Sequence, residues 1–295
     1  MQTKCGFVAI IGKPNEGKST LLNAILGTKL SIITPKPQTT RKKILGIHTI
    51  NNLQIIFTDT PGIIKPKYEL QKVMMDYVDE SIKECDLLIY LIAADKLIEK
   101  DIPGYMIDLL NNYQNKKIAV INKIDLLENK KDVLPYIAKM HSMNIFEDIV
   151  PISALHNDNV DRMLEVITKF IPEAPFLYDD DMLSTQNERF FVSEIIRETI
   201  FEEFEEEIPY STEVQINTFN EREGQKWFIA ADIIIERTSQ KKIIIGENGA
   251  GIKKIGAISR QKIEEHLGAE IFLQLFVKVR NKWRDDKSKL KFMGY

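Results

Sequence analysis

Nine residues near the N-terminus constrain the fold more than any other stretch. They read Gly12-Lys13-Pro14-Asn15-Glu16-Gly17-Lys18-Ser19-Thr20, with two glycines at a fixed spacing before a Lys-Ser pair. Residues 6–11 before them form an apolar run typical of a buried strand, and residues 19–26 have helical spacing of apolar side chains. A strand that ends in a glycine-rich loop and opens a helix points several backbone N–H groups at one place. The stretch therefore predicts a cradle for phosphate.

The residues of this loop have separate predicted roles. Lys18 reaches the β- and γ-phosphates and is a candidate catalytic cation, while the Ser19 hydroxyl ligates Mg²⁺. Asn15 stands where a potassium ion could contact the phosphates. Glu16 is unexpected, because a carboxylate in a phosphate cradle is unfavourable unless its side chain points outward. The candidate nucleotide-binding residues here are Gly12, Asn15, Glu16, Gly17, Lys18, Ser19 and Thr20.

Strand-like and helix-like segments alternate as far as residue 171. This alternation predicts an α/β domain with a mostly parallel sheet and helices on both faces. In such sheets the ligand lies beyond the carboxyl ends of the strands, so the remaining motifs should follow strands. The later strands are expected at residues 44–50, 53–58, 86–93, 117–121 and 149–152, and the later helices at 68–83, 102–113, 133–142 and 159–170.

Four residues directly follow the third predicted strand and read Asp59-Thr60-Pro61-Gly62. The Asp59 carboxylate is expected to hold Mg²⁺ through water, and the Gly62 N–H to meet a γ-phosphate and assist catalysis. All four are candidate nucleotide-binding residues. Taken alone, the stretch is equally well interpreted as a Pro-Gly turn.

A second motif, Asn122-Lys123-Ile124-Asp125, follows the strand that ends at residue 121. The Asp125 carboxylate can accept two N–H donors from the Watson–Crick edge of guanine, which adenine cannot supply. Asn122 can bond the base or brace the phosphate loop, and the aliphatic stem of Lys123 can lie over the ring. Alone, such a string is a common surface turn.

Ser153 and Ala154 follow the next strand, and the backbone N–H of Ala154 is the expected donor to guanine O6. Four motifs in this order, each after a strand, together predict a domain that binds GTP or GDP with Mg²⁺. Ile63 occupies the position where many switch GTPases carry a glutamine that orients the attacking water. Because isoleucine cannot do this, we expect slow intrinsic hydrolysis.

The polar stretch 31–43 lies between the first helix and the second strand and contains Gln38-Thr39-Thr40-Arg41. A loop of this length in a compact domain is usually functional or mobile. Thr40, or less favourably Thr39, is expected to complete the Mg²⁺ shell when a γ-phosphate is present. The metal ligands predicted are thus Ser19, Thr40 and Asp59, and Thr40 is also a candidate catalytic residue. The alternative is a solvated linker.

A second domain is expected after residues 171–176, where two prolines precede an acidic cluster. The predicted domains are a nucleotide-binding domain at 1–174, a linker at 175–187 and an RNA-binding domain at 188–295. An amphipathic helix is expected at residues 188–207, and strands at 213–219, 227–235 and 270–279.

A Gly-x-x-Gly loop, Gly246-Glu247-Asn248-Gly249, lies between an aliphatic run and a helix that carries Lys253 and Lys254. With the strand-helix-helix-strand order, this pattern is the signature of an α+β KH domain of type II, whose loop clamps about four single-stranded nucleotides. Propensity favours a strand at residues 243–245, whereas the KH fold requires the end of a helix there. The candidate RNA-binding residues are Ile245, Gly246, Glu247, Asn248, Gly249, Lys253, Lys254, Lys278, Arg280 and Trp283.

Charge is unevenly distributed along the chain. Residues 241–295 contain 13 Lys and Arg against 6 Asp and Glu, whereas the whole chain has a net charge of -3. A local basic excess of this kind suits a polyanionic partner. Trp283 either stacks on a nucleobase or packs against the strands. Glu247 should weaken phosphate attraction at the clamp itself, which leaves Lys253 and Lys254 to supply charge.

The two cysteines, Cys5 and Cys85, lie far apart and belong to no metal-binding cluster. This usage favours a reducing compartment and argues against disulfides or structural zinc. The N-terminal residues lead straight into the first strand without space for a signal peptide, and no apolar run approaches a membrane span. These features predict a cytoplasmic protein.

A nucleotide-binding domain of this kind joined to a KH domain resembles the Era family of bacterial ribosome-assembly GTPases over essentially the whole chain. The resemblance implies binding near the 3′ end of 16S ribosomal RNA, action on the 30S subunit during its maturation, and GTP hydrolysis as a release switch. It also implies a cytoplasmic monomer with peripheral association to the inner membrane. Glu16 and Glu247-Asn248 depart from the family pattern. The segments that carry the resemblance are Gly12–Thr20, Gln38–Arg41, Asp59–Gly62, Asn122–Asp125, Ile152–Ala154, Ile245–Gly256 and Val277–Val279 with Trp283.

We therefore expect a molecular switch in which GTP and Mg²⁺ order residues 31–43 and 61–66 and so change how the KH face meets RNA. One alternative is a nucleotide-gated RNA-binding scaffold with negligible turnover. Another is a GTPase of tRNA modification, which the absence of a C-terminal cysteine disfavours.

Overall fold

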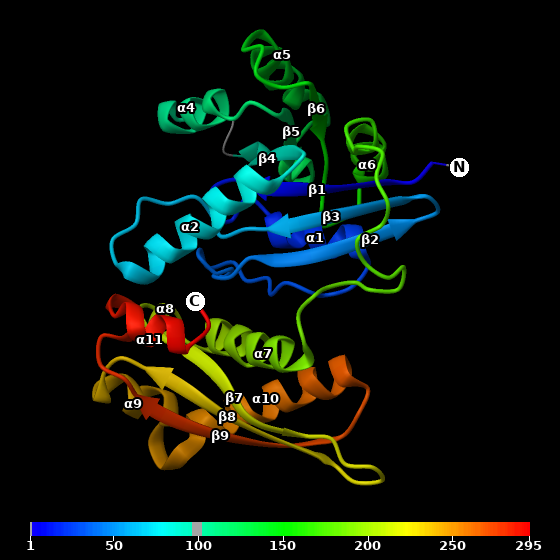
Figure 1. The fold of residues 1–295 in the computed structure, drawn as a ribbon. Helices are drawn as coiled ribbons and strands as arrows, with labels where there is room; N and C mark the ends of the chain where they lie inside the picture. The colour runs from blue at the N-terminus through cyan, green and yellow to red at the C-terminus, as the bar shows by residue number, and fades with distance from the viewer. Residues whose placement is uncertain (1, 96–101) are drawn as a thin grey trace. The chain divides into compact units, whose positions relative to one another are not determined.

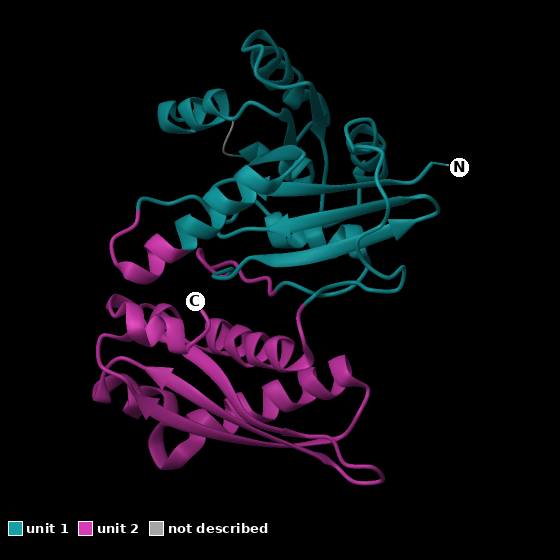
Figure 2. Ribbon diagram, in the orientation of Figure 1, with its two compact units in different colours: residues 1–31, 40–65, 74–185 teal, residues 32–39, 66–73, 186–295 magenta. Residues whose placement is uncertain are grey.

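The computed structural model describes residues 2–95 and 102–295, and its contacts divide the chain into two compact units (Figure 2). The first unit contains residues 1–31, 40–65 and 74–185, and the second contains 32–39, 66–73 and 186–295. Within the described residues, no helix combines the length and the apolar character that a membrane span requires.

A six-stranded sheet in the order β2-β3-β1-β4-β5-β6 forms the centre of the first unit (Figure 1). β2 pairs antiparallel with β3, and the other neighbouring strands are parallel. The predicted mostly parallel sheet is therefore confirmed. Its strands are β1 (Lys4–Ile11), β2 (Ile44–Ile50), β3 (Leu53–Asp59), β4 (Leu87–Ala93), β5 (Lys116–Asn122) and β6 (Asp148–Pro151).

Helices cover both faces of this sheet, which is why the central strands are apolar along their whole length. Leu21 and Leu22 of one helix and Met163 of another pack with Val8 on one face. Met106 packs on the opposite face. The face that contains Val8 is covered by α1 (Lys18–Leu26) and α6 (Val160–Thr168). The opposite face is covered by α2 (Glu69–Glu84), α4 (Gly104–Asn112) and α5 (Leu134–Ser142).

The second unit has a three-stranded sheet in the order β7-β8-β9, in which β8 pairs antiparallel with β7 and parallel with β9. Between β8 and β9 the chain forms two helices joined by residues 246–249, as a KH fold requires. The elements are α7 (Glu188–Glu203), α8 (Ile208–Ser211), β7 (Glu213–Asn220), β8 (Trp227–Ile235), α9 (Thr238–Ile245), α10 (Ala250–Leu267), β9 (Ile271–Val279) and α11 (Lys287–Phe292).

Strand alternation gives the edge strand β9 of this smaller sheet a covered face and an exposed one. Ile229 and Ile233 of β8 point into the core, where they meet Ile196 of α7 and Ile263 of α10. In β9, every second residue is exposed, namely Phe272, Gln274, Phe276 and Lys278. Helices therefore cover one face of the sheet, while β9 carries exposed side chains on the other.

Two predicted helix boundaries need correction. The helix predicted at 188–207 ends at Glu203, because Phe204 adopts an extended backbone. Carboxylates from Glu205 to Glu207 would be unfavourable at a helix C-terminus, whose dipole end is negative. The helix predicted from residue 102 begins at Gly104, after the extended Pro103. By contrast, residues 243–245 do end helix α9, as the KH interpretation required.

The compact units differ from the predicted domains at two places. Most of the predicted linker belongs to the first unit, because the Gln54 side chain accepts hydrogen bonds from the backbone of Leu177 and Tyr178. Residues 32–39 and 66–73, which precede the predicted boundary in sequence, belong to the second unit. No sequence pattern marks this assignment, since it depends on tertiary contacts.

Candidate functional site

Glycines let the phosphate loop approach its neighbours closely. Gly17 caps the start of α1 with φ +96°, a left-handed conformation that L side chains avoid. A Cβ on Gly17 would lie 2.3 Å from Asn122 Nδ2, and one on Gly12 would lie 2.4 Å from the Leu91 carbonyl oxygen. Similarly, a Cβ on Gly62 would lie 2.6 Å from Pro14 N. The glycines of two motifs are therefore required for the loop to have this shape.

Lys18 folds back over the loop that precedes it. Its Nζ donates to the Lys13 carbonyl at 2.9 Å and to the Gly12 carbonyl at 3.4 Å. The side chain is buried. This position places a positive charge at the centre of the loop, beside the first-turn N–H groups of α1, which include that of Thr20. A positive charge beside free N–H groups is suited to binding phosphate.

The three predicted metal ligands lie together at the ends of their elements. Ser19 Oγ donates to Asp59 Oδ2 at 2.7 Å and lies 2.9 Å from Thr40 Oγ1. Hydroxyl and carboxylate oxygens are the donors that Mg²⁺ prefers. Thr39, the alternative ligand, uses its hydroxyl to donate to the Lys36 carbonyl at 2.8 Å, which favours Thr40.

The Asp59 carboxylate has an incomplete set of partners that a cation would complete. It is fully buried, and its Oδ1 has no hydrogen-bond partner among the described residues. Burial raises the pKa of Asp59, while the hydrogen bond from Ser19 and the charge of Lys18 act in the opposite direction. A divalent cation at Oδ1 would offset the burial. The donor set therefore fits Mg²⁺.

Glu16 is buried, but its carboxylate points away from the cradle. Its Oε2 accepts a hydrogen bond from the backbone N–H of Ala93 at the end of β4. Its backbone carbonyl accepts from Asn122 Nδ2 at 2.9 Å. Because Ala93 and Asn122 are register partners in adjacent strands, Glu16 ties the phosphate loop to two strand ends at once.

Asn122 braces the phosphate loop, which was one of its two predicted roles. Its Oδ1 also accepts from the backbone N–H of Ala154 at 2.9 Å. The contact of this N–H with guanine O6 stays a prediction, and the structure pairs the N–H with Asn122. The network links the phosphate end of the site to the loop after β6.

Neighbouring side chains fix the orientation of the Asp125 carboxylate, the predicted acceptor for guanine. Ser153 Oγ donates to its Oδ1 at 2.5 Å, and His156 Nε2 lies 4.0 Å from its Oδ2. Lys123 has a left-handed backbone, and its Nζ donates to the Asn15 carbonyl at 2.8 Å. The carboxylate and the lysine stem thus flank one place beside the phosphate loop.

The residues after β3 close over the phosphate loop from the other side. Thr60 Oγ1 donates to the Ile10 carbonyl at 2.7 Å, so this hydroxyl has a structural partner. The Ile63 N–H donates to the Gly12 carbonyl at 2.9 Å, which places Pro61 and Gly62 against the loop. Ile63 itself is buried in the core between the sheet and α2. Its side chain therefore has a packing role and offers no group to orient water.

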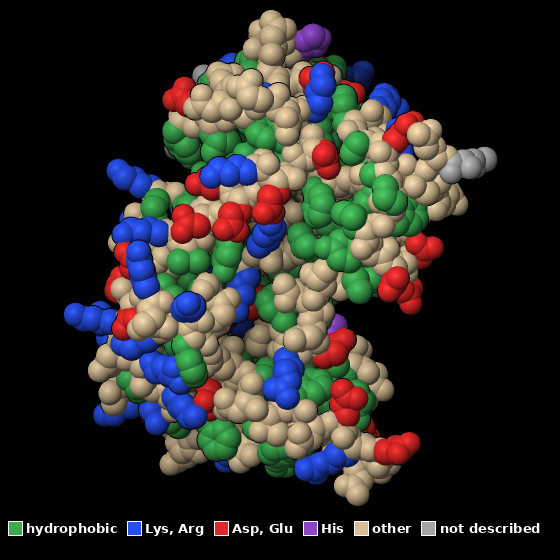
Figure 3. All heavy atoms as spheres, in the orientation of Figure 1, with side chains coloured by type: hydrophobic (Ala, Val, Ile, Leu, Met, Phe, Trp, Pro, Cys, Tyr) green, Lys and Arg blue, Asp and Glu red, His purple; other side chains and the backbone are tan. Residues whose placement is uncertain are grey.

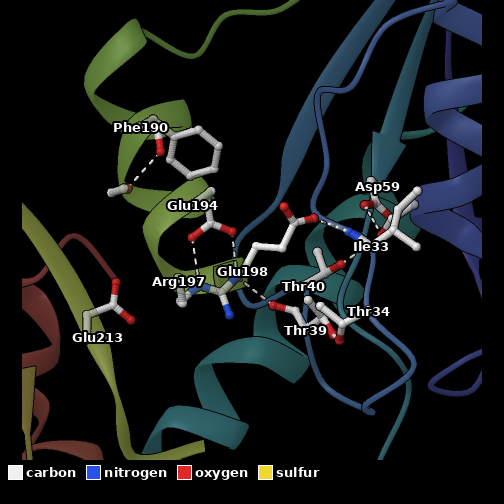
Figure 4. A network of polar contacts seen from close by, with 12 residues as sticks. Ile33, Thr34, Thr39, Thr40, Asp59, Phe190, Glu194, Arg197, Glu198 and Glu213 are labelled. Atoms are coloured by element: carbon white, nitrogen blue, oxygen red, sulfur yellow. Dashed lines mark hydrogen bonds and ion pairs between the residues drawn. The ribbon is translucent and has the colours of Figure 1, made fainter. Parts of the chain in front are cut away.

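Residues 32–39, which lead directly to Thr40, are held on α7 of the second unit. Figure 4 shows the Arg197 guanidinium between the Glu194 carboxylate and the Thr39 carbonyl. Nη2 donates to the Thr39 carbonyl at 2.6 Å, and Nε donates to Glu194 Oε1 at 2.8 Å. Lys36 Nζ donates to the carbonyls of Phe201 and Phe204 at the end of α7, at 2.6 and 2.5 Å. Sequence reasoning missed Arg197, because nothing in a helical pattern marks a buried arginine.

We expect Arg197→Met to reduce the free energy of unfolding by about 3–5 kcal/mol, because it leaves the Glu194 carboxylate without its partner. Burial by itself would lower the pKa of Arg197, but the charge and hydrogen bonds of Glu194, together with the charge of Glu213, raise this pKa above its ordinary value. Arg162→Met is the matched control, because Arg162 pairs with Glu165 at the same i,i+3 spacing but on the surface. Its effect should stay within about 0.5 kcal/mol. Equal losses in urea unfolding would contradict the role given to Arg197.

In the second unit, the loop between α9 and α10 has the backbone that a Gly-x-x-Gly clamp needs. Gly246 has φ +70°, and a Cβ there would lie 2.7 Å from Gly251 N. Gly249 and Asn248 also have left-handed backbones. Glu247 and Asn248 are exposed at the tip. Ile245 ends α9 immediately before the loop.

A groove of ≈490 Å³ lies between α10 and the edge strand β9. Lys253 of the predicted set lines it, together with Ile252 and Leu275. Sequence reasoning missed three further polar lining residues, and the helical spacing from Lys253 to Arg260 is a signal that could have found one of them. The missed residues are Lys226, Arg260 and Gln274.

Two candidate RNA-binding residues need correction. Trp283 is 0% exposed and its Nε1 donates to the Ser211 carbonyl at 3.0 Å. It therefore cannot stack on a nucleobase, and the packing alternative is correct. Lys254 pairs with Glu203 of α7, so its ammonium is directed away from the groove.

Two other candidates remain on the surface with partners of their own. Lys278 Nζ pairs with Asp232 at 2.5 Å, and the Arg280 guanidinium lies 4.9 Å from the centre of the Phe292 ring. On the face drawn in Figure 3, lysine and arginine side chains gather over α9 and α11. The basic excess of residues 241–295 is thus a surface feature.

Two family models match the chain. The model described as 50S ribosome-binding GTPase matches residues 7–123, and the model described as KH domain matches residues 207–284.

Similar proteins cover nearly the full chain. GTPase Era of Geotalea uraniireducens is 46% identical over 100% of this chain and 98% of its own length. GTPase Era of Geobacter metallireducens is 46% identical over 99% of this chain and 98% of its own length.

Solved structures agree. A crystal structure of Era in complex with MgGDPNP and nucleotides 1506–1542 of 16S ribosomal RNA aligns with a TM-score of 0.94, at 39% identity and 99% coverage of both chains. A variant of Aquifex aeolicus Era bound to GDP·AlF4⁻ aligns with the same score, identity and coverage.

The fold and the phosphate and base loops define a P-loop GTPase domain joined to a C-terminal KH domain. The family resemblance drawn from the motifs is confirmed at this level of identity and coverage. The chain belongs to the Era family of GTPases.

Proposed function

We propose that this GTPase is a molecular switch that binds 16S ribosomal RNA near its 3′ end and acts in maturation of the small ribosomal subunit. The observation that carries the proposal is the convergence of Ser19, Thr40 and Asp59 on one place beside the phosphate loop, in a chain that also holds a Gly-x-x-Gly clamp. The similar Era structure bound to MgGDPNP and 16S ribosomal RNA supports it.

In the proposed site, a guanine nucleotide contacts three regions of the first unit. The phosphates lie on residues 12–20, the base meets Asp125, and Thr40 and Gly62 respond to the γ-phosphate. Bound Mg²⁺ supplies charge neutralisation at the β- and γ-phosphates. Lys18 adds a second positive charge beside the same phosphates.

In the second unit, the backbone of residues 246–249 clamps about four nucleotides of single-stranded RNA. The groove beside it supplies apolar contact through Ile252 and Leu275 and positive charge through Lys253 and Arg260. We place the protein in the cytoplasm as a monomer, with peripheral association to the inner membrane.

Single-turnover hydrolysis tests the switch against a scaffold with negligible turnover. Because Ile63 is buried and offers no water-orienting group, we expect slow hydrolysis by the protein alone and faster hydrolysis with small subunits. The measurement is phosphate release from radiolabelled GTP, with and without subunits. A rate that stays negligible in both conditions, while nucleotide still gates RNA binding, would favour the scaffold.

A further inference from the structure

In the second unit, the face of edge strand β9 that points away from the helices carries exposed aromatic side chains. Phe272 is 57% exposed and Phe276 is 44% exposed, although both lie in the middle of a regular strand. Phe228 of β8 is the register partner of Phe272, and the two rings stack with centres 5.9 Å apart. Exposed apolar rings that gather in one patch, and are not scattered singly, are typical of interaction sites.

Polar and basic groups alternate with these rings. Gln274 lies between the two phenylalanines on β9, and Lys278 follows them on the same face. Arg222 places its guanidinium 5.5 Å from the centre of the Phe228 ring. Aromatic rings among bases are typical of surfaces that bind single-stranded nucleic acid.

This face is continuous with the groove beside the Gly-x-x-Gly loop. Phe272 and Gln274 line the groove together with Ile252 and Lys253 of α10. β9 is the edge strand of its sheet, so among the described residues no further strand pairs with its outer edge, where a strand of RNA that leaves the groove can pass.

We propose that the exposed face of β9 is a second single-stranded RNA site, which takes the nucleotides that continue beyond the clamp by stacking their bases on Phe272 and Phe276. The two residues are four positions apart, or about 13 Å along the strand, so they take two separate bases. Arg222, which is exposed beside Phe228, attracts the phosphates between them. The inference rests on the proposed RNA-binding function and extends it.

The test compares two RNA lengths and two substitutions in the full-length chain. The probes are fluorescein-labelled RNAs of 5 and 12 nucleotides from the 3′ end of 16S ribosomal RNA. The double variant Phe272→Leu/Phe276→Leu keeps apolar volume but removes the rings. We expect it to bind the 12-nucleotide RNA about 5- to 150-fold more weakly per stacked base, the equivalent of about 1–3 kcal/mol. The single variant Phe276→Leu, whose ring lies outside the groove lining, should keep its affinity for the 5-nucleotide RNA within about twofold.

Phe272→Tyr/Phe276→Tyr should restore binding of the longer RNA, because tyrosine keeps a ring that stacks. Tyr105→Ala is the matched control, since Tyr105 is also an exposed aromatic residue (55%) but belongs to the first unit. Thermal unfolding of each variant checks that the fold is unchanged.

Three results would overturn the proposal while leaving RNA binding intact. The leucine variant could bind the longer RNA as the parent protein does. The Phe276→Leu variant could bind the longer RNA normally, which would mean that the rings act only through Phe272 in the groove. Or the double variant could bind RNA normally and fail to sediment with small subunits, which would assign the face to a protein partner. Failure of the parent protein to bind either RNA would instead refute the proposed function itself.

Discussion

Replacing Asp125 with asparagine is expected to exchange GTP for xanthosine triphosphate as the preferred nucleotide. The Asp125 carboxylate accepts two N–H donors from guanine, and each charge-assisted bond contributes about 1.5–3 kcal/mol. Their loss lowers GTP affinity by about 10²- to 10⁴-fold. Xanthine presents an oxygen where guanine has its amino group, so an amide side chain restores a donor–acceptor pair. The measurement is competition between the two triphosphates for a fluorescent nucleotide.

The matched control is Asp158→Asn. Asp158 is a nearby carboxylate that pairs with Lys130 at 2.6 Å, and its loss should leave the choice of nucleotide unchanged. If the Asp125→Asn variant still preferred GTP, the assignment of Asp125 as the acceptor for the guanine N–H groups would be wrong.

Gly17→Ala should reduce nucleotide affinity by roughly 10- to 400-fold. Its Cβ would lie 2.3 Å from Asn122 Nδ2, so either the loop or the Asn122 brace must move. An L side chain at φ +96° adds strain of about 1–2 kcal/mol, and the lost hydrogen bond adds about 0.5–1.5 kcal/mol. The dissociation constant for GDP, measured by calorimetry, reports the effect.

Gly27 provides the control for backbone strain alone. It also has a left-handed backbone, at φ +65°, but a Cβ there would meet no atom within 4 Å. Gly27→Ala should therefore lower the melting temperature slightly and leave GDP affinity unchanged. If the two variants lost affinity equally, the close approach at Gly17 would not be what the site requires.

The first unit could be predicted closely because its signals are local. Strand and helix periodicity, and motifs at strand ends, gave the sheet, and the structure brings Ser19, Thr40 and Asp59 together as expected. From the sequence we could say only that the Glu16 side chain should point out of the phosphate cradle, and not which group it contacts. Its partner, the Ala93 N–H, lies 77 residues away in sequence.

The second unit was harder to predict where contacts are distant. Trp283 lies among basic residues, which favoured an RNA role, yet tertiary packing buries it against Ser211. The place of residues 32–39 on α7 depends on Arg197, which lies 158 residues from Thr39. No periodicity or motif carries information over that separation.

That same contact bears on how nucleotide could influence RNA binding. Thr39 is held by α7, and Thr40, the next residue, meets Ser19 at the predicted metal site. A ligand that shifts Thr40 therefore acts on a segment anchored to the unit that carries the clamp. Coupling of this kind must be reciprocal, so RNA should tighten GTP binding by the factor by which GTP tightens RNA binding.

Coupling between nucleotide and RNA is measured most directly as the affinity of a radiolabelled 16S 3′-end oligonucleotide, in parallel with a non-hydrolysable GTP analogue and with GDP. We expect tighter binding with the analogue, typically 5- to 150-fold for a coupled pair of sites. Equal affinity in the two nucleotide states would contradict this coupling.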